Sequence, residues 1–219
     1  MDDEITKNTQ VTYDRVADEY VRRIYDELRH KLLDRQLLSQ FAARVHGLGP
    51  ICDLGCGPGH VARYLHECEA QVIGIDLSAE MIERARRLNP GIEFQQDNMY
   101  ALNVGDATWA GMTAFYSIIH IPRTDHLRVW SELWRVLRPG GLLLLAFHIG
   151  DEVVHLDELW GQAVSIDFHF FRATEIADSL RSARFEIEKV IERDPYPDIE
   201  AQTRRGYILA KKPDGSGRS

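Results

Sequence analysis

Residues 51–59 read Ile-Cys-Asp-Leu-Gly-Cys-Gly-Pro-Gly. An apolar run over 50–54 that carries Asp53 leads into three glycines at alternate positions, and the next residues, 60–67, are compatible with a helix. This order predicts a strand, a tight glycine loop and a helix, the arrangement with which a doubly wound sheet binds a nucleotide-like ligand. Glycine suits such a loop because the backbone turns sharply and approaches the ligand without a Cβ in the way.

The spacing of the glycines separates two kinds of nucleotide site. A dinucleotide site calls for G-x-G-x-x-G, with a helix N-terminus aimed at pyrophosphate. Here Gly55, Gly57 and Gly59 give G-x-G-x-G, and Asp53 stands two residues before the first glycine. A carboxylate in that position suits a cationic ligand better than a pyrophosphate. A turn that merely needs glycines is the alternative.

A second acid follows at the distance expected for a ribose-binding residue. Residues 71–76 read as a buried strand that ends in Asp76, about twenty residues beyond the glycine loop, where a carboxylate can accept hydrogen bonds from both ribose hydroxyls. Ser78 is a candidate N-cap for a helix over 78–88. Met81 on that helix is a candidate for the same site, with a core role as the alternative.

A third acid stands after the next expected strand. Residues 92–96 predict a strand, and Asp97-Asn98-Met99 follow directly. An aspartate in a loop is commonly just solvated, so Asp97 gains its interest from the two acids before it. Three acidic positions at three successive strand ends are more specific than any one of them.

With these residues in view, the chain resembles the class I S-adenosylmethionine-dependent methyltransferases, whose first motif has the form D-L-G-C-G-x-G. The resemblance implies S-adenosylmethionine as cofactor and S-adenosylhomocysteine as product. It places the residue after the second acid against adenine, and Asp97 near the adenine amino group, although Gln96 stands where glycine is frequent. The cofactor-binding residues that it implies are Tyr13, Tyr20, Asp53, Gly55, Cys56, Gly57, Gly59, Asp76, Leu77, Met81, Asp97, Asn98, Met99 and Tyr116.

The segment before the first strand predicts a lid. Residues 11–45 show apolar side chains at helical spacing and predict one or two helices. Tyr13 and Tyr20 stand in a stretch that resembles the Y-D-x-x-A-x-x-Y element with which many small-molecule methyltransferases cover the cofactor. The alternative is that the two tyrosines only pack this helix onto the domain.

The order of the remaining elements predicts an α/β protein. Strands are expected over 71–76, 92–96, 111–115, 142–148, 185–191 and 206–211, and helices over 78–88, 125–137 and 173–183, with Pro139-Gly140-Gly141 as a turn before the fifth strand. Such alternation gives parallel strands joined by helices. The last two strands leave no room for a helix between them and should form a hairpin with one antiparallel strand. The resemblance implies a doubly wound, seven-stranded sheet in the order 3-2-1-4-5-7-6, with an N-terminal helical lid.

We therefore expect a helical extension over residues 1–45, a methyltransferase domain over 46–212 and a disordered tail over 213–219. The net charge of −8 disfavours a nucleic-acid partner, because phosphate binding calls for a basic surface. The longest apolar stretch is too short to span a membrane, and the polar start has no signal-peptide character, so we expect a cytoplasmic protein. Cys52, Cys56 and Cys68 fit small packing residues better than disulfides or metal ligands, and no metal is expected. Monomer and homodimer both remain open.

Candidates for the acceptor side come from loops at the ends of the fourth and fifth strands. His120 and His148 are candidate bases if the acceptor carries a hydroxyl, because a histidine near neutral pKa can take its proton. An amine, thiol or halide acceptor needs no base. The segment 153–171 is rich in aromatic residues, and 164–170 alternates as an extra edge strand would. The candidate acceptor contacts there are Trp160, Phe168, His169 and Phe170.

Two functions compete with methyl transfer to a small molecule. A nicotinamide-dependent oxidoreductase would use the same fold, but G-x-G-x-x-G is missing. A protein that binds S-adenosylmethionine without turnover would carry the same cofactor motifs. The acceptor atom is not determined by any motif.

Overall fold

A computed structural model describes residues 2–215 of the chain. Its centre is a seven-stranded sheet in the order β3-β2-β1-β4-β5-β9-β8, in which β9 is antiparallel to both of its neighbours. This is the predicted order 3-2-1-4-5-7-6, which is confirmed together with the terminal hairpin. The strands of this sheet are β1 (Ile51–Leu54), β2 (Val72–Asp76), β3 (Glu93–Gln96), β4 (Trp109–Phe115), β5 (Leu137–His148), β8 (Glu186–Arg193) and β9 (Arg205–Lys211).

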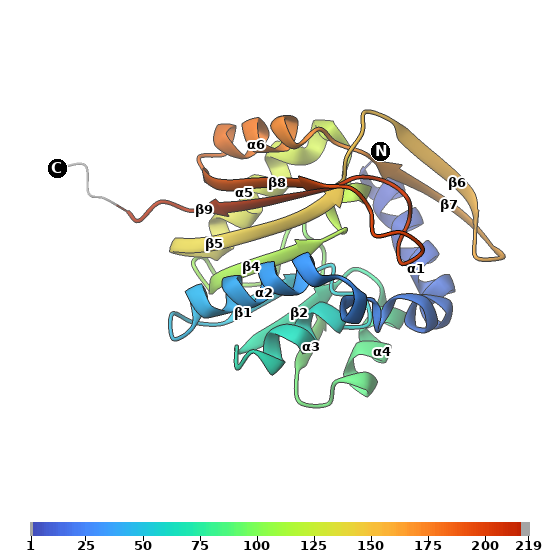
Figure 1. Cartoon of the computed structure of the whole chain (residues 1–219), viewed down its shortest axis with the longest axis horizontal. Helices are drawn as coiled ribbons and strands as arrows, with labels where there is room; N and C mark the ends of the chain where they lie inside the picture. The colour runs from blue at the N-terminus through green and yellow to red at the C-terminus, as the bar shows by residue number, and fades with distance from the viewer. Residues whose placement is uncertain (1, 216–219) are drawn as a thin grey trace.

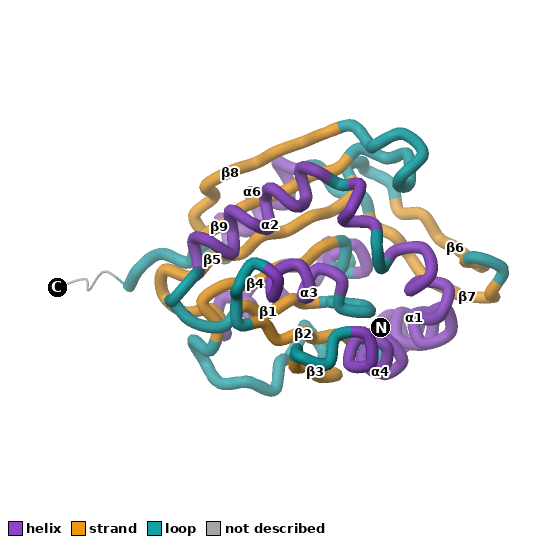
Figure 2. Tube along the Cα trace, turned by 60° about the horizontal axis from the view of Figure 1, so that its bottom comes forward, coloured by secondary structure: helices purple, strands orange, loops and turns teal. Residues whose placement is uncertain are grey.

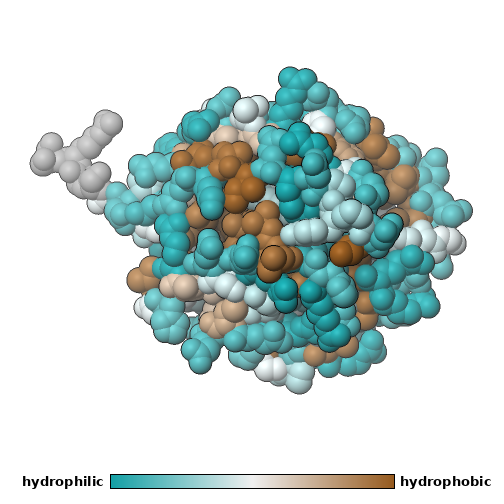
Figure 3. All heavy atoms as spheres, in the orientation of Figure 1, coloured by the Kyte–Doolittle hydropathy of each residue, from teal (hydrophilic) through white to brown (hydrophobic). Residues whose placement is uncertain are grey.

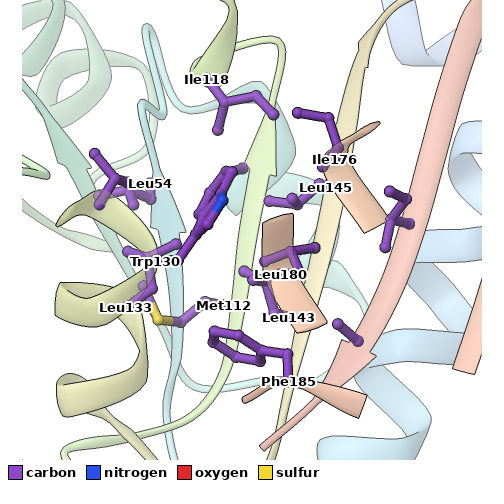
Figure 4. Close-up of a cluster of buried hydrophobic side chains, with 14 of the residues drawn as sticks. Leu54, Met112, Ile118, Trp130, Leu133, Leu143, Leu145, Ile176, Leu180 and Phe185 are labelled. Carbon is purple, nitrogen blue, oxygen red and sulfur yellow. The ribbon is translucent and has the colours of Figure 1, made fainter. Parts of the chain in front are cut away.

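Helices cover both faces of the sheet (Figure 1). One face packs against α2 (Leu32–Val45), α3 (His60–Glu67) and α4 (Ala79–Leu88), and the other against α5 (His126–Val136) and α6 (Ala173–Ser182). The central strands are apolar throughout because both of their faces are buried. Figure 4 shows the second layer, where Trp130 and Leu133 of α5 and Leu180 of α6 meet β4 and β5.

Two further elements lie at the carboxyl ends of the parallel strands (Figures 1 and 2). The long helix α1 (Asp2–Ile24) packs against α4 and against a separate hairpin of β6 (Val153–Leu159) and β7 (Gln162–His169). Short 3-10 turns, η1 (Glu27–His30), η2 (Ile118–His120) and η3 (Arg123–Asp125), complete the elements. The helix and the hairpin together enclose this end of the sheet.

The structure corrects three expectations. The N-terminal helix begins at Asp2 and not near residue 11, and Ile5 and Thr9 continue the face of this helix that carries Tyr13. Residues 164–170 fall largely in β7, but β7 pairs only with β6 and is no edge of the main sheet. Arg138–Gly141 lie inside β5, where they form an irregularity in the pairing with β4, and not in a turn before the strand. The predicted disordered tail falls mostly on residues 216–219, which lie outside the described residues.

None of the helices within residues 2–215 is both long and apolar enough to cross a membrane.

On the face shown in Figure 3, apolar side chains gather over the part of the sheet formed by β5, β9 and β8, beside α2. Among the exposed large apolar side chains is Val190 of β8, which is 43% exposed.

Candidate functional site

A cavity lies at the carboxyl ends of β1, β2 and β4, beneath α1. The space inside it, together with the open solvent at its mouth, is about 790 Å³. It forms where the order of the strands reverses between β1 and β4, which is where open α/β sheets bind ligands. The cavity is lined by Ile5, Thr6, Thr9, Gln10, Tyr13, Tyr20, Leu54, Gly55, Gly57, Ile75, Asp76, Leu77, Ser78, Met81, Asp97, Asn98, Met99, Tyr100, Phe115, Tyr116, Ser117, His120 and Ile121.

The glycine loop after β1 forms one wall of the cavity, and the surroundings of its three glycines differ. Gly55 and Gly59 have φ angles of +70° and +83°, and a Cβ at either would lie within 3 Å of a neighbouring side chain. Gly57 has φ +52°, but a Cβ there would meet only Tyr20 Cε1, at 3.6 Å. Gly57 therefore faces open cavity space, whereas the other two glycines permit close packing within the protein.

Asp76 ties the end of β2 to the glycine loop. Its Oδ2 accepts a hydrogen bond from the Gly57 amide and its Oδ1 from the Ser78 amide, both at 2.8 Å. Burial raises the pKa of Asp76 to about 6, although these hydrogen bonds favour the charged form. Ser78 caps α4 as predicted, since its Oγ accepts from the Met81 amide at 3.1 Å. The carboxylate remains among the cavity-lining groups.

The third acid organises the loop after β3. Asp97 Oδ1 accepts from the Asn98 amide at 2.8 Å, and its Oδ2 accepts from the Asn103 amide at 2.7 Å. Asn98 Oδ1 in turn accepts from the Tyr100 amide at 3.0 Å. These local bonds hold residues 97–100 in a fixed turn along the cavity.

The helix α1 closes the cavity from above. Asp14 Oδ1 accepts from Ser78 Oγ at 2.6 Å and from the Glu80 amide at 3.2 Å, which docks α1 on the first turn of α4. Tyr13 and Tyr20 project from this helix into the cavity, and their rings meet edge to face at 5.9 Å. The predicted lid helix therefore lies over the predicted glycine loop.

His120 stands at the end of η2 with both ring nitrogens engaged. Its Nδ1 lies 3.0 Å from the Asp167 carbonyl oxygen, and its Nε2 lies 2.7 Å from the Tyr13 hydroxyl. A carbonyl oxygen only accepts, so Nδ1 carries the proton and Nε2 accepts from Tyr13. Burial lowers the pKa of His120 to about 4, which keeps the ring neutral near pH 7.

His148, the other candidate base, has the opposite tautomer and does not line the cavity. Its Nδ1 lies 2.9 Å from Arg205 Nη1 and 2.7 Å from Thr203 Oγ1. Because a guanidinium only donates, Nδ1 must accept and the proton sits on Nε2. Burial and the charge of Arg205 lower the pKa of His148 to about 3. Because Nε2 of His148 already carries a proton, this nitrogen cannot take a proton from an acceptor.

Not all predicted site residues meet at the cavity. Cys56 and Gly59 belong to the loop but do not line it. Asp53 is buried below the loop, where its Oδ1 accepts from Thr113 Oγ1 at 2.9 Å, and burial raises its pKa to about 6. Its Oδ2 has no hydrogen-bond partner among the described residues.

The aromatic residues of the hairpin segment surround the site without lining it. Trp160 meets the ring of Tyr20 at 5.9 Å, and Phe168 meets the ring of His120 at 4.9 Å. Phe170 packs on His148 at 5.2 Å. His169 is buried and stacks on Phe171, so its side chain belongs to the core.

The sequence interpretation missed the first two turns of α1. Ile5, Thr6, Thr9 and Gln10 line the cavity together with Tyr13. Residues 5, 9 and 13 recur every fourth position, which is the spacing of one helix face, so the signal was present in the sequence.

The described cavity lining carries carboxylates but no lysine or arginine. Its ionisable side chains besides the tyrosines are Asp76, Asp97 and His120, and this set suits a cationic ligand. Two buried cations, Lys31 and Arg205, have their charged ends 5.2 and 5.4 Å from the centre of the Tyr116 ring. Both are engaged elsewhere, Lys31 with Glu27 and Glu200, and Arg205 with backbone carbonyls and His148.

Comparison with known proteins shows that this chain is similar to methyltransferases. Residues 51–141 match a family model described as a methyltransferase domain. The chain is 30% identical over 135 residues to malonyl-[acyl-carrier protein] O-methyltransferase of Enterobacter lignolyticus, a match that covers 60% of this chain and 53% of that protein. It is 37% identical over 101 residues to trans-aconitate 2-methyltransferase of Azoarcus sp., covering 43% of this chain and 37% of that protein. The matches thus span about half or less of these relatives.

Solved structures share the fold over most of the chain. The DhpI–SAH complex superposes with a TM-score of 0.73 at 18% identity and covers 97% of this chain and 98% of that one. A SAM-dependent methyltransferase of Methanosarcina mazei superposes with a TM-score of 0.68 at 21% identity, covering 75% of this chain and 92% of that one.

Proposed function

The chain belongs to the class I S-adenosylmethionine-dependent methyltransferases, and from this premise we propose that it methylates a small-molecule acceptor held beside the cofactor in the cavity under α1. The cofactor, when bound, supplies an activated methyl group. The protein then needs to align the acceptor with it and to keep the attacking atom unprotonated. One observation carries the proposal: Gly57 faces open space next to the carboxylate of Asp76, in a cavity whose described lining holds no cation.

The residues present fit the cofactor. An added Cβ at Gly57 would project into the cavity, so the bare backbone there leaves room for the ligand. Asp76 is the proposed partner of the ribose hydroxyls, and residues 97–99 are the proposed adenine contacts, with Leu77 and Met81 on the apolar side. Asp53 and Cys56 are buried and do not line the cavity. Tyr13 and Tyr20 complete the enclosure from α1.

His120 is the proposed base for an acceptor group that carries a proton. Its Nε2 is the unprotonated nitrogen of a neutral ring at the cavity surface. His148 is not proposed as a base because its Nδ1 accepts from Arg205. Phe168 and Trp160 pack against His120 and Tyr20 and are proposed to bound the acceptor side.

Binding and turnover test this function in order. Calorimetry should show micromolar binding of S-adenosylmethionine and S-adenosylhomocysteine, a free energy of about 8 kcal/mol, and no binding of NAD. A metabolite library is then screened by release of S-adenosylhomocysteine. Binding of NAD without binding of either sulfur compound would refute the proposal, and tight cofactor binding without turnover of any acceptor would favour a non-catalytic binding protein.

A further inference from the structure

Three separate elements meet at His120 through a continuous chain of hydrogen bonds. The carbonyl of Asp167 in β7 accepts from Nδ1, and the Tyr13 hydroxyl in α1 donates to Nε2. The Asp167 carboxylate faces outward, where it binds His155 Nδ1 at 2.7 Å, so it does not compete for the His120 ring. The hairpin thus fixes the tautomer of His120, and α1 occupies the one nitrogen able to act as a base.

This arrangement limits what an acceptor can contact. Nε2 has a single lone pair, and the Tyr13 hydroxyl already uses it at 2.7 Å. A hydroxyl oxygen that donates its only proton still has two lone pairs with which to accept. Both residues line the cavity, but only the Tyr13 oxygen keeps lone pairs with which to accept from an incoming X–H group, because Nε2 of His120 is already bonded.

The charges around the cavity limit the acceptor further. A carboxylate acceptor would find no lysine or arginine among the described lining residues, and it would share the cavity with the carboxylates of Asp76 and Asp97. Lys31 is 3% exposed and holds Glu27 at 2.8 Å and Glu200 at 3.3 Å, so it is not free to turn toward the cavity. An ion buried without a partner carries a penalty of several kcal/mol. A neutral group that can donate a hydrogen bond is the better match.

We propose that the acceptor is a neutral hydroxyl compound and that Tyr13 is a catalytic residue, which relays the hydroxyl proton of this acceptor to His120. This inference rests on the proposed function. As the acceptor oxygen bonds to the methyl carbon, the carbon–sulfur bond breaks and its electron pair stays on sulfur. The acceptor O–H bond breaks at the same time: its proton passes to Tyr13 Oη, and the proton of Tyr13 passes to His120 Nε2.

The resting state suits such a concerted transfer. Burial raises the pKa of Tyr13 and lowers that of His120, so both groups are neutral before the reaction. A base this weak does not deprotonate a free hydroxyl on its own. Proton transfer is therefore coupled to formation of the bond to carbon, and the products are a methyl ether, neutral Tyr13 and protonated His120.

The first test needs no acceptor. Nitrogen NMR of the full chain, labelled with ¹⁵N-histidine and saturated with S-adenosylhomocysteine, should show His120 neutral, protonated at Nδ1 and hydrogen-bonded at Nε2. Tyr13→Phe should shift the Nε2 resonance of His120. Tyr64→Phe, which removes a tyrosine hydroxyl bonded to Ser39 outside the cavity, should leave that resonance where it is. His120 protonated at Nε2, or unmoved by Tyr13→Phe, would overturn the relay.

The second test concerns the class of acceptor. Pairs of compounds with the same skeleton, one a neutral hydroxyl and one a carboxylate (phenol with benzoate, benzyl alcohol with phenylacetate), are compared by release of S-adenosylhomocysteine. The hydroxyl member should be preferred, and Tyr13→Phe and His120→Gln should each lower its kcat about 100-fold, the lower end of general acid–base effects. Preferred turnover of the carboxylate, undiminished in Tyr13→Phe, would overturn this inference while leaving the proposed function intact. Failure of the wild-type chain to bind S-adenosylhomocysteine would instead overturn the proposed function.

Discussion

The amide of Gly57 donates to Asp76 Oδ2 at 2.8 Å, which joins the loop after β1 to the end of β2 across 19 residues of chain. The other oxygen of the same carboxylate accepts from Ser78 at the start of α4. One side chain therefore positions the glycine loop and the helix N-terminus as well as facing the cavity. A substitution of Asp76 must therefore distinguish its structural role in the protein from its role in ligand binding.

Asp76→Asn is the informative substitution, because an amide oxygen can still accept one of the two backbone hydrogen bonds. We expect binding of S-adenosylhomocysteine to weaken by about 1.5–3 kcal/mol, the range for a hydrogen bond to a charged group. Calorimetry gives the affinity, and near-UV circular dichroism checks the fold. Asp178→Asn, at an exposed carboxylate on α6 that pairs with Arg181, is the control and should bind normally. An unchanged dissociation constant in Asp76→Asn would remove this residue from the ribose site.

The raised pKa of Asp76 predicts a pH dependence of cofactor binding. Burial raises this pKa to about 6, and the nearby charge of Asp14 on α1 contributes to the rise. The carboxylate is therefore charged at pH 7–8 and becomes protonated as the pH falls through 6, which removes part of its capacity to accept hydrogen bonds. We expect the affinity for S-adenosylhomocysteine to be constant above pH 7 and to fall by up to tenfold per pH unit below 6.

Calorimetry between pH 5 and 8 measures this dependence. Asp53 also has a pKa of about 6, so the profile of Asp53→Asn is needed beside that of the wild-type chain. If Asp76 is responsible, the profile of Asp53→Asn keeps its fall below pH 6 and that of Asp76→Asn is flatter. Affinity that does not change between pH 5 and 8 would contradict the assignment.

The main sheet could be predicted from the sequence because its signals are local. Glycines, strand-end acids and short apolar runs are set by backbone conformation and by burial on both faces of a central strand. Ser78 shows this well: an N-cap is defined by its own side chain and the next helical turn, and the structure bears it out. The strand order, by contrast, came from the family resemblance.

The acceptor side could not be predicted in the same way, since it depends on contacts between distant segments. The tautomers of His120 and His148 are set by Asp167 and Arg205, which lie 47 and 57 residues away in sequence. Two histidines at neighbouring strand ends are indistinguishable by position, yet of the two only His120 lines the cavity, whereas the unprotonated nitrogen of His148 accepts from Arg205. Likewise, nothing in the spacing of β6 and β7 says that they form a sheet of their own beside α1.

The docking of α1 predicts how the cofactor enters and leaves. Asp14 holds this helix to Ser78 and to the Glu80 amide, so Asp14→Ala should loosen the lid without touching the core. We expect faster hydrogen exchange over residues 5–20 and a dissociation rate of S-adenosylhomocysteine raised several-fold, measured by stopped flow. Asp18→Ala removes a surface pair with Arg84 on the same two helices and should have little effect, as exposed ion pairs contribute little. Equal rates in Asp14→Ala and the wild-type chain would show that α1 does not gate the cavity.

Gly57 and Gly59 offer a matched test of where the cofactor lies, because both have positive φ but different surroundings. At Gly57 an added methyl group meets only Tyr20 Cε1, at 3.6 Å, so Gly57→Ala should destabilise the protein by about 1–2 kcal/mol through backbone strain alone. Each kcal/mol of destabilisation lowers the melting temperature of a protein of this size by about 2–4 °C. Binding of S-adenosylhomocysteine should nevertheless be abolished, since the methyl group enters the ligand's space.

Gly59→Ala should have the opposite result, with a large loss of stability and a smaller loss of affinity. Its Cβ would lie 2.7 Å from Phe94 Cζ and 2.8 Å from Asn89 Nδ2, and the Asn89 amide is fixed by bonds to the carbonyls of Pro58 and Ala85. We therefore expect a much lower melting temperature, with the folded fraction retaining measurable affinity. Melting temperature and affinity are measured on the same preparation of each variant. A Gly57→Ala protein that binds S-adenosylhomocysteine normally would remove the cofactor from this loop, and with it the placement of the site.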